Sequence, residues 1–96
     1  MENNIIKLEF DKTISGLAGN DYGYEEYKKQ IMNKFDYTKI NTIIFPEYIK
    51  KVAISFVQGM FTEILKVIDK NEIEKHVIIK SSSEQLTNKI ISNIKF

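Results

Sequence analysis

The sequence predicts an α/β fold: a single small domain with a largely parallel central sheet of about four strands and helices packed over it. Strand-like and helix-like segments alternate along the chain, and right-handed crossovers turn that order into a parallel sheet. The run Ile43 to Phe45 is apolar on both faces, as central parallel strands are. With 96 residues, we expect one domain spanning 1–96.

The composition excludes several classes of function. The chain has 14 basic and 13 acidic side chains without long runs of either sign, so we expect no nucleic-acid partner. It has no cysteine, which excludes disulfides, thiolate metal sites and cysteine nucleophiles and fits a reducing compartment. No apolar run approaches the roughly 20 residues that span a bilayer, and the start lacks a signal-peptide pattern. We therefore expect a cytoplasmic protein without a membrane partner.

The first predicted strand is Asn4 to Phe10, in which Ile6, Leu8 and Phe10 alternate with charged residues. This alternation is typical of a strand with one solvent-exposed face, and it favours an edge position. An unprotected edge would offer a simple route to a homodimer.

A glycine-rich segment follows at Gly16 to Gly23, GLAGNDYG, and predicts a loop whose backbone visits positive φ. Asp21 is the expected N-cap of the next helix. An ion pair between Glu25 and Lys29, one turn apart, would support that helix. Its apolar stripe is Tyr24, Tyr27, Ile31 and Phe35.

The second predicted strand, Ile40 to Phe45, ends at Pro46 and leads through a link to the central helix, Ile54 to Asp69. We expect a short turn in this link around Tyr48 and Ile49. The apolar stripe of the central helix is Phe56, Val57, Met60, Phe61, Ile64, Leu65 and Ile68.

The start of the central helix carries a capping pattern, because Gln58 follows Ser55 by three residues. Ser55 is therefore the expected N-cap. Gly59 costs this helix about 1 kcal/mol relative to alanine, which indicates that another backbone lies close to it.

The last third of the chain predicts a third strand and a final helix. Asn71 is the expected C-cap of the central helix, and His76 to Ile79 is the third strand. Either Ser81 or Ser82 caps the last helix, since an S-x-x-E and an S-x-x-Q pattern begin there. The inner face of that helix is Leu86, Ile90, Ile91 and Ile94.

The segments 17–27, LAGNDYGYEEY, and 42–65, TIIFPEYIKKVAISFVQGMFTEIL, together with the VIIK strand and its helix, resemble the STAS-like family of small bacterial domains. The most specific part is I-x-F-P followed by A-x-S-F-x-Q-G-x-F. The resemblance implies an α/β fold that binds partner proteins. In the related anti-sigma-factor antagonists, a serine or threonine that opens the helix after a central strand is phosphorylated by a kinase, and Ser55 stands at the matching place.

The first functional hypothesis is a non-enzymatic protein–protein interaction module, with Ser55 as the candidate phospho-acceptor. The resemblance implies a histidine-kinase-type ATPase as the partner. A phosphate on Ser55 would carry roughly −1.5 to −2 charge beside the positive end of the helix, where it is stabilised. The candidate partner-binding residues, on the helix tip and the glycine loop, are Asn20, Asp21, Tyr22, Tyr48, Phe56 and Gln58.

Two alternatives remain open. In the first, the protein is a structural or inhibitory partner from a phage or defence cluster, and Ser55 is only a helix cap. In the second, the amides of the Gly16–Gly23 loop bind an anion or a nucleotide phosphate, although the spacing matches no established phosphate-binding pattern. His76 is the single histidine and no spacing pairs two carboxylates, so we expect no metal site, no cofactor and no enzyme activity.

Overall fold

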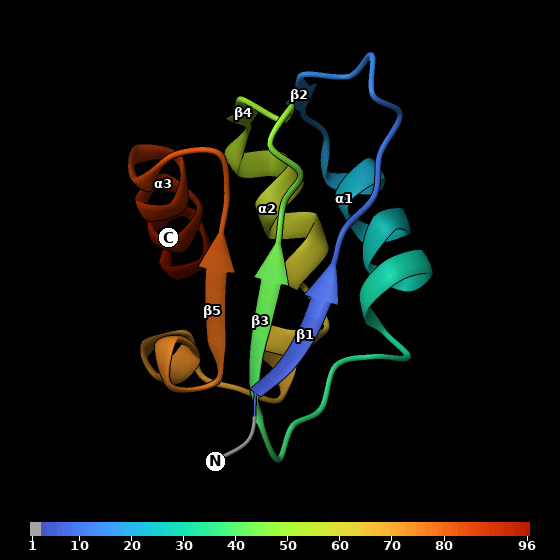
Figure 1. Cartoon of the computed structure of the whole chain (residues 1–96). Coiled ribbons are helices and arrows are strands. Elements are labelled where there is room, and N and C mark those ends of the chain that lie inside the picture. The colour runs from blue at the N-terminus through green and yellow to red at the C-terminus, as the bar shows by residue number, and fades with distance from the viewer. Residues whose placement is uncertain (1–2) are drawn as a thin grey trace.

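The computed structural model describes residues 3–96, so Met1 and Glu2 of the predicted domain lie outside the described part of the chain. Three parallel strands form the main sheet in the order β1-β3-β5 (Figure 1). Their bounds are Asn3–Lys7 for β1, Ile40–Ile44 for β3 and Val77–Lys80 for β5. The predicted α/β character and the parallel sheet are confirmed, and the first strand lies at an edge as expected. The sheet has three strands rather than about four.

A separate two-stranded parallel ribbon accounts for two further strands, β2 (Gly16–Leu17) and β4 (Lys51–Val52). The sequence analysis placed these residues in a loop and a link, because two-residue strands are too short to carry a period-2 pattern. Each strand of the ribbon runs into a helix. The ribbon thereby places the starts of helices α1 (Asn20–Glu26) and α2 (Ile54–Phe61) side by side.

The helical segments are shorter and less regular than predicted. Helix α1 continues into a π-helical turn, η1 (Tyr27–Ile31). The predicted helix over 54–69 ends as an α-helix at Phe61 and is followed by the 3₁₀ segments η2 (Ile64–Lys66) and η3 (Lys70–Lys75). The Thr62 hydroxyl donates to the Gln58 carbonyl at this end, a bond that competes with regular helix geometry. Helix α3 (Glu84–Lys95) closes the chain.

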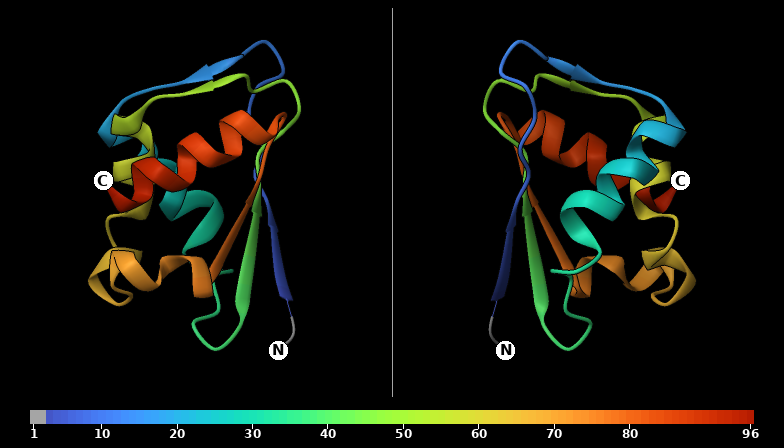
Figure 2. Two further views of the ribbon diagram at one scale, coloured as in Figure 1. Left: turned by 90° about the vertical axis from the view of Figure 1, so that its left-hand side faces the viewer. Right: turned by 90° about the vertical axis from the view of Figure 1, so that its right-hand side faces the viewer.

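All the helices lie on one side of the three-stranded sheet (Figure 2). The residues that point to this side alternate along each strand, as the pattern of the first strand predicted. They form one core with the inner faces of α2 and α3. Its fully buried members include Ile6, Ile43, Phe45, Phe56, Val57, Met60, Phe61, Ile64 and Ile90.

The structure corrects the predicted start of α1. The N-cap is Gly19, with a φ of 104°, and Asp21 lies within the first turn. Gly23 belongs to the helix and is buried, so only part of the Gly16–Gly23 segment is a loop. The predicted ion pair between Glu25 and Lys29 is also wrong, because the Glu25 carboxylate forms an ion pair with the Lys28 ammonium group at 3.2 Å.

Two further caps differ from the predictions. Ser83 caps α3 by accepting the Leu86 N–H at 3.1 Å. Ser81 donates to the Ser83 carbonyl and Ser82 to the Ile49 carbonyl, so neither is available as a cap. Asn71 does not end the central helix but lies inside η3.

Among residues 3–96, no helix is long and apolar enough to cross a membrane.

Candidate functional site

Ser55 lies in the first turn of α2, but it is not the N-cap. Ala53 holds that position in an extended conformation, because its N–H donates to the Leu17 carbonyl across the ribbon at 2.8 Å. The half-buried Ser55 hydroxyl instead accepts the Gly19 N–H at 3.0 Å. Gln58 is exposed and does not reach back to the helix start. The predicted capping pattern is therefore wrong, and Ser55 joins α2 to the start of α1.

Two amides of the glycine loop are already engaged. The Gly19 N–H donates to Ser55, and the Gly23 N–H donates to the Gly19 carbonyl at 3.0 Å. These two amides are therefore not directed at a common anion position, as the nucleotide-phosphate hypothesis requires.

The predicted partner-binding residues divide between surface and core. Asn20, Asp21 and Gln58 are exposed. Tyr22 is half-buried, and its ring contacts that of Phe56 with centroids 5.2 Å apart. Burial raises the pKa of the Tyr22 hydroxyl, and the Glu26 carboxylate raises this pKa further. Phe56 is fully buried, so its side chain lies in the core and not on the surface where a partner contact was expected.

Tyr48 also has a structural contact. Its hydroxyl donates to the Phe10 carbonyl and lies 3.2 Å from the Phe10 N–H, from which it accepts. This pair of hydrogen bonds ties the link before β4 to the segment after β1. The half-buried Tyr48 side chain therefore holds two loops together.

The single histidine, His76, is half-buried between η3 and β5, and its carbonyl accepts the Asn41 N–H at 2.8 Å. In the described part of the chain, no three His, Asp or Glu side chains gather in a geometry that could hold a metal ion.

The sheet presents an uncovered side, which we name the open face and define as Ile5, Lys7, Thr42, Ile44, Ile78 and Lys80. Ile5 and Ile78 flank Thr42 in one row and are 59% and 38% exposed, whereas the short Thr42 side chain between them is only 5% exposed. Lys7 and Lys80 flank Ile44 in the next row. No helix within residues 3–96 covers this side of the sheet (Figure 2). The apolar run in β3 predicted coverage on both sides, and this prediction is wrong for the side that carries Ile44.

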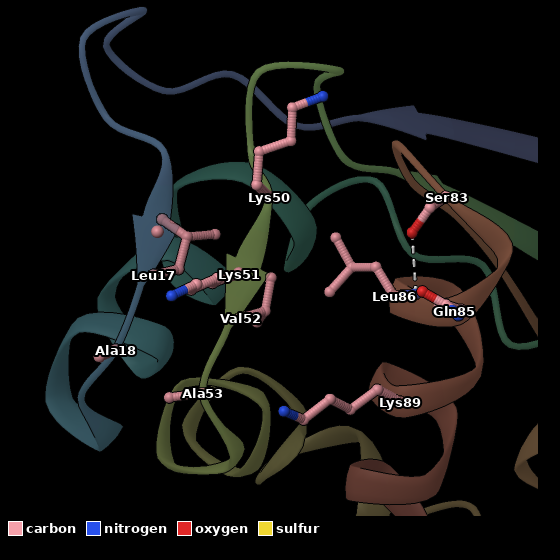
Figure 3. Close-up of a pocket in the computed structure, with 11 residues that line it drawn as sticks. Leu17, Ala18, Lys50, Lys51, Val52, Ala53, Ser83, Gln85, Leu86 and Lys89 are labelled. Atoms are coloured by element: carbon pink, nitrogen blue, oxygen red, sulfur yellow. Dashed lines mark hydrogen bonds between the residues drawn. The ribbon is translucent and has the colours of Figure 1, made fainter.

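A second surface feature, which we name the lysine pocket, lies between the β2–β4 ribbon and the start of α3 (Figure 3). Its volume is about 670 Å³. The side chain of Leu86 points from α3 toward Val52 of β4, and Lys89 extends from α3 toward Ala53 (Figure 3). The lining residues are Gly16, Leu17, Ala18, Lys50, Lys51, Val52, Ala53, Ser83, Gln85, Leu86 and Lys89. These residues come from three segments that are distant in the sequence, so no local pattern predicts the pocket.

Comparison of the chain with protein-family models, with curated proteins and with solved structures finds no match. The resemblance to STAS-like domains therefore stays a prediction.

Proposed function

We propose that the protein is a non-enzymatic binding module whose open face docks on a partner protein. The observation that carries this proposal is an all-parallel sheet with helices on only one side (Figure 2). Parallel sheets almost always have both faces covered, because their helical crossovers pack on both sides, and their strands are correspondingly apolar on both faces. Here two isoleucines, Ile5 on β1 and Ile78 on β5, lie exposed in the same row on the two opposite edge strands of the sheet. A partner that covers this row would remove their apolar area from water, which favours association.

The charges on the open face specify the kind of partner. Strands β1, β3 and β5 carry Lys7 and Lys80 and no acidic residue. Within residues 3–96, neither ammonium group forms an ion pair. The matching surface is an apolar centre with carboxylates beside it. A second copy of the chain would bring only further lysines to the contact, so we favour a different, acidic protein as the occupant.

The test compares the wild type with an Ile5→Asp/Ile78→Asp variant as bait in extracts of the source cell. The matched control is Val67→Asp, which adds a carboxylate at an apolar side chain that is 67% exposed and lies outside the open face. Any protein retained by the wild type is then purified and titrated against all three forms. Circular dichroism checks that each variant is folded, and light scattering gives the oligomeric state.

The proposal predicts a partner that binds the wild type and Val67→Asp equally and binds the double variant at least tenfold more weakly. Lys7→Gln/Lys80→Gln should weaken the same complex and reduce its salt dependence. Equal binding by all forms would overturn the proposal. So would a wild-type dimer that the double variant abolishes, because the face would then be occupied by a second copy.

A second candidate function is regulation at Ser55, and the contact between its hydroxyl and the Gly19 N–H favours it. A phosphate on Ser55 would lie beside this amide and the first turn of α2, where anionic groups are stabilised. The adjacent starts of α1 and α2 would then carry a strong negative charge. Ser55 is on the helix side of the sheet, so this charge would act on a surface separate from the open face.

The regulatory hypothesis is tested by incubating the protein with ATP and a histidine-kinase-type ATPase from the same organism. Mass spectrometry should locate one phosphoryl group on Ser55, and Ser55→Ala should remain unmodified. Wild-type protein that stays unmodified would remove the hypothesis. A gene neighbourhood of phage or defence genes without such an ATPase would favour the alternative of an inhibitory partner protein without a switch.

A further inference from the structure

We propose that the lysine pocket binds a small organic anion that combines a carboxylate or phosphate group with an apolar body. The pocket is separate from the open face, because β4 and α3 lie on the helix side of the sheet (Figure 2). It provides two kinds of contact at once, ammonium groups and apolar side chains.

The charges of the pocket are unbalanced. Lys50, Lys51 and Lys89 line it together with no acidic residue. Across residues 3–96, none of these three ammonium groups has a carboxylate within ion-pair distance. Elsewhere among the described residues, several exposed lysines do have a carboxylate partner, although Lys7 and Lys80 of the open face do not. The paired ones with a glutamate three residues earlier are Lys28, Lys29, Lys66 and Lys75. An anion in the pocket would provide the missing opposite charge.

The apolar contacts come from the ribbon and α3. Leu17, Val52 and Leu86 form the buried floor of the pocket, with Leu86 pointing toward Val52, and are 2%, 3% and 7% exposed (Figure 3). The accessible apolar wall is formed by Ala18 and Ala53, toward which Lys89 extends. The volume of about 670 Å³ lies within the range of about 300–1,000 Å³ that is usual for small-molecule pockets. An inorganic anion would leave the accessible Ala18 and Ala53 side chains uncovered, and a neutral hydrocarbon would leave the lysines unpaired. The pocket therefore fits a molecule with both parts.

This site differs from the phosphate cradle that the glycine loop suggested. The Gly19 and Gly23 amides are bonded within the protein, so lysine side chains supply the charge recognition. Gly16 and Ala18 contribute only part of the wall. The neutral polar groups beside the lysines are Ser83 and Gln85, and the Ser83 hydroxyl is already used as the cap of α3.

The experiment titrates isotope-labelled protein with octyl phosphate below its micelle-forming concentration and follows backbone amide shifts by NMR. Octanol and inorganic phosphate are the matched probes, since each carries one half of the proposed ligand. Saturable shifts should concentrate at Leu17, Val52, Ala53 and the first two turns of α3. Octyl phosphate should bind at least tenfold more tightly than either half, and added salt should weaken its binding.

Two charge variants test the role of the lysines, one in the pocket and one on the open face as the matched control. Lys51→Gln/Lys89→Gln should bind octyl phosphate about tenfold more weakly, since each lysine contributes a modest ion pair. Lys7→Gln/Lys80→Gln loses the same number of charges on the open face and should bind like the wild type. In the titration with the partner protein, Lys7→Gln/Lys80→Gln should bind more weakly and Lys51→Gln/Lys89→Gln should bind like the wild type. Failure of one proposal can thus be distinguished from failure of the other.

Three results would overturn the proposal. The first is the absence of saturable shifts at the pocket, and the second is equal binding of octanol and octyl phosphate. The third is unchanged affinity in Lys51→Gln/Lys89→Gln. The protein could also cosediment with vesicles of phosphatidylglycerol and show no saturable binding of octyl phosphate. That result would contradict a soluble ligand, because the lysines would then bind a lipid surface.

Discussion

Gly23 of α1 and Gly59 of α2 each lie against the backbone of the other helix. A Cβ at Gly23 would be 2.1 Å from the Phe56 carbonyl oxygen, and a Cβ at Gly59 would be 2.0 Å from the Asn20 carbonyl oxygen. Side chains cannot approach a backbone this closely, so the two helices can cross here only through glycine. The close backbone that Gly59 predicted is confirmed, and α1 provides it.

We therefore expect Gly23→Ala and Gly59→Ala each to destabilise the protein by about 2–3 kcal/mol, which lowers Tm by roughly 10–20 °C. Intrinsic helix propensity alone predicts the opposite sign, a gain of about 1 kcal/mol. Thermal and urea unfolding measure the difference. The control is Gly16→Ala, where the nearest atoms to a new Cβ are 3.8 Å away. A variant of Gly23 or Gly59 as stable as Gly16→Ala would contradict the packing.

Ser55→Ala removes the acceptor of the Gly19 N–H, and we expect a loss of about 1 kcal/mol in the free energy of unfolding. Hydrogen exchange should accelerate at the Gly19 amide. If Ser55 were instead the N-cap, the faster exchange would fall on the first-turn amides of α2. Ser92→Ala is the matched control, because this exposed α3 serine has no side-chain hydrogen bond within the described chain.

Asn41 is fully buried and connects three segments by hydrogen bonds. Its Nδ2 donates to the Asp36 carbonyl at 2.8 Å, and its Oδ1 accepts from Asn4 Nδ2 at 2.8 Å and from the Asp36 N–H at 2.9 Å. Asn41→Leu leaves these half-buried groups of Asn4 and Asp36 without their partners, so we expect a loss of about 2–4 kcal/mol. Urea unfolding measures it against Asn88→Leu on the surface of α3. A loss below about 1 kcal/mol would show that the network can rearrange.

Asp36 predicts an acid-dependent contribution to stability. The hydroxyl and then the N–H of Thr38 donate to its carboxylate and lower its pKa below 3.8. Because the folded pKa is the lower one, the stabilisation is fully present above the unfolded pKa and is lost as pH falls through the folded pKa. The stability difference between wild type and Asp36→Asn should therefore be constant near neutral pH and shrink below about pH 4. An NMR titration that places the Asp36 pKa at or above 3.8 would contradict this.

Several elements could be predicted because their information is local. The alternation of Ile6 and Leu8 with charged residues identified β1 and its inner face, and the spacing of Leu86, Ile90 and Ile94 identified the buried side of α3. Both patterns follow directly from the 2.0 and 3.6 residue periods of strands and helices. The single glycine of α2 also indicated a close backbone correctly, since its intrinsic cost needs a compensating contact.

The predictions failed where distant segments decide the geometry. Ser55 matches a capping pattern, yet the Ala53 N–H donates to the Leu17 carbonyl in the ribbon and makes Ala53 the N-cap. The helix therefore begins at Ile54, one residue before Ser55. Gly23 resembles a loop residue, yet packing against α2 holds it inside a helix. The lysine pocket combines residues from three distant segments, and neither its lysines nor its apolar wall forms a local pattern.

By itself, the sequence determined the parallel α/β arrangement and the inner side of the edge strand and the last helix, because periodic burial is encoded within each segment. Only the tertiary structure decided that every helix lies on one side of the sheet. An isoleucine run such as that in β3 has the same pattern whether its second face is covered by a helix or left open. Coverage depends on where the crossovers pass, and therefore on contacts between residues far apart in the chain.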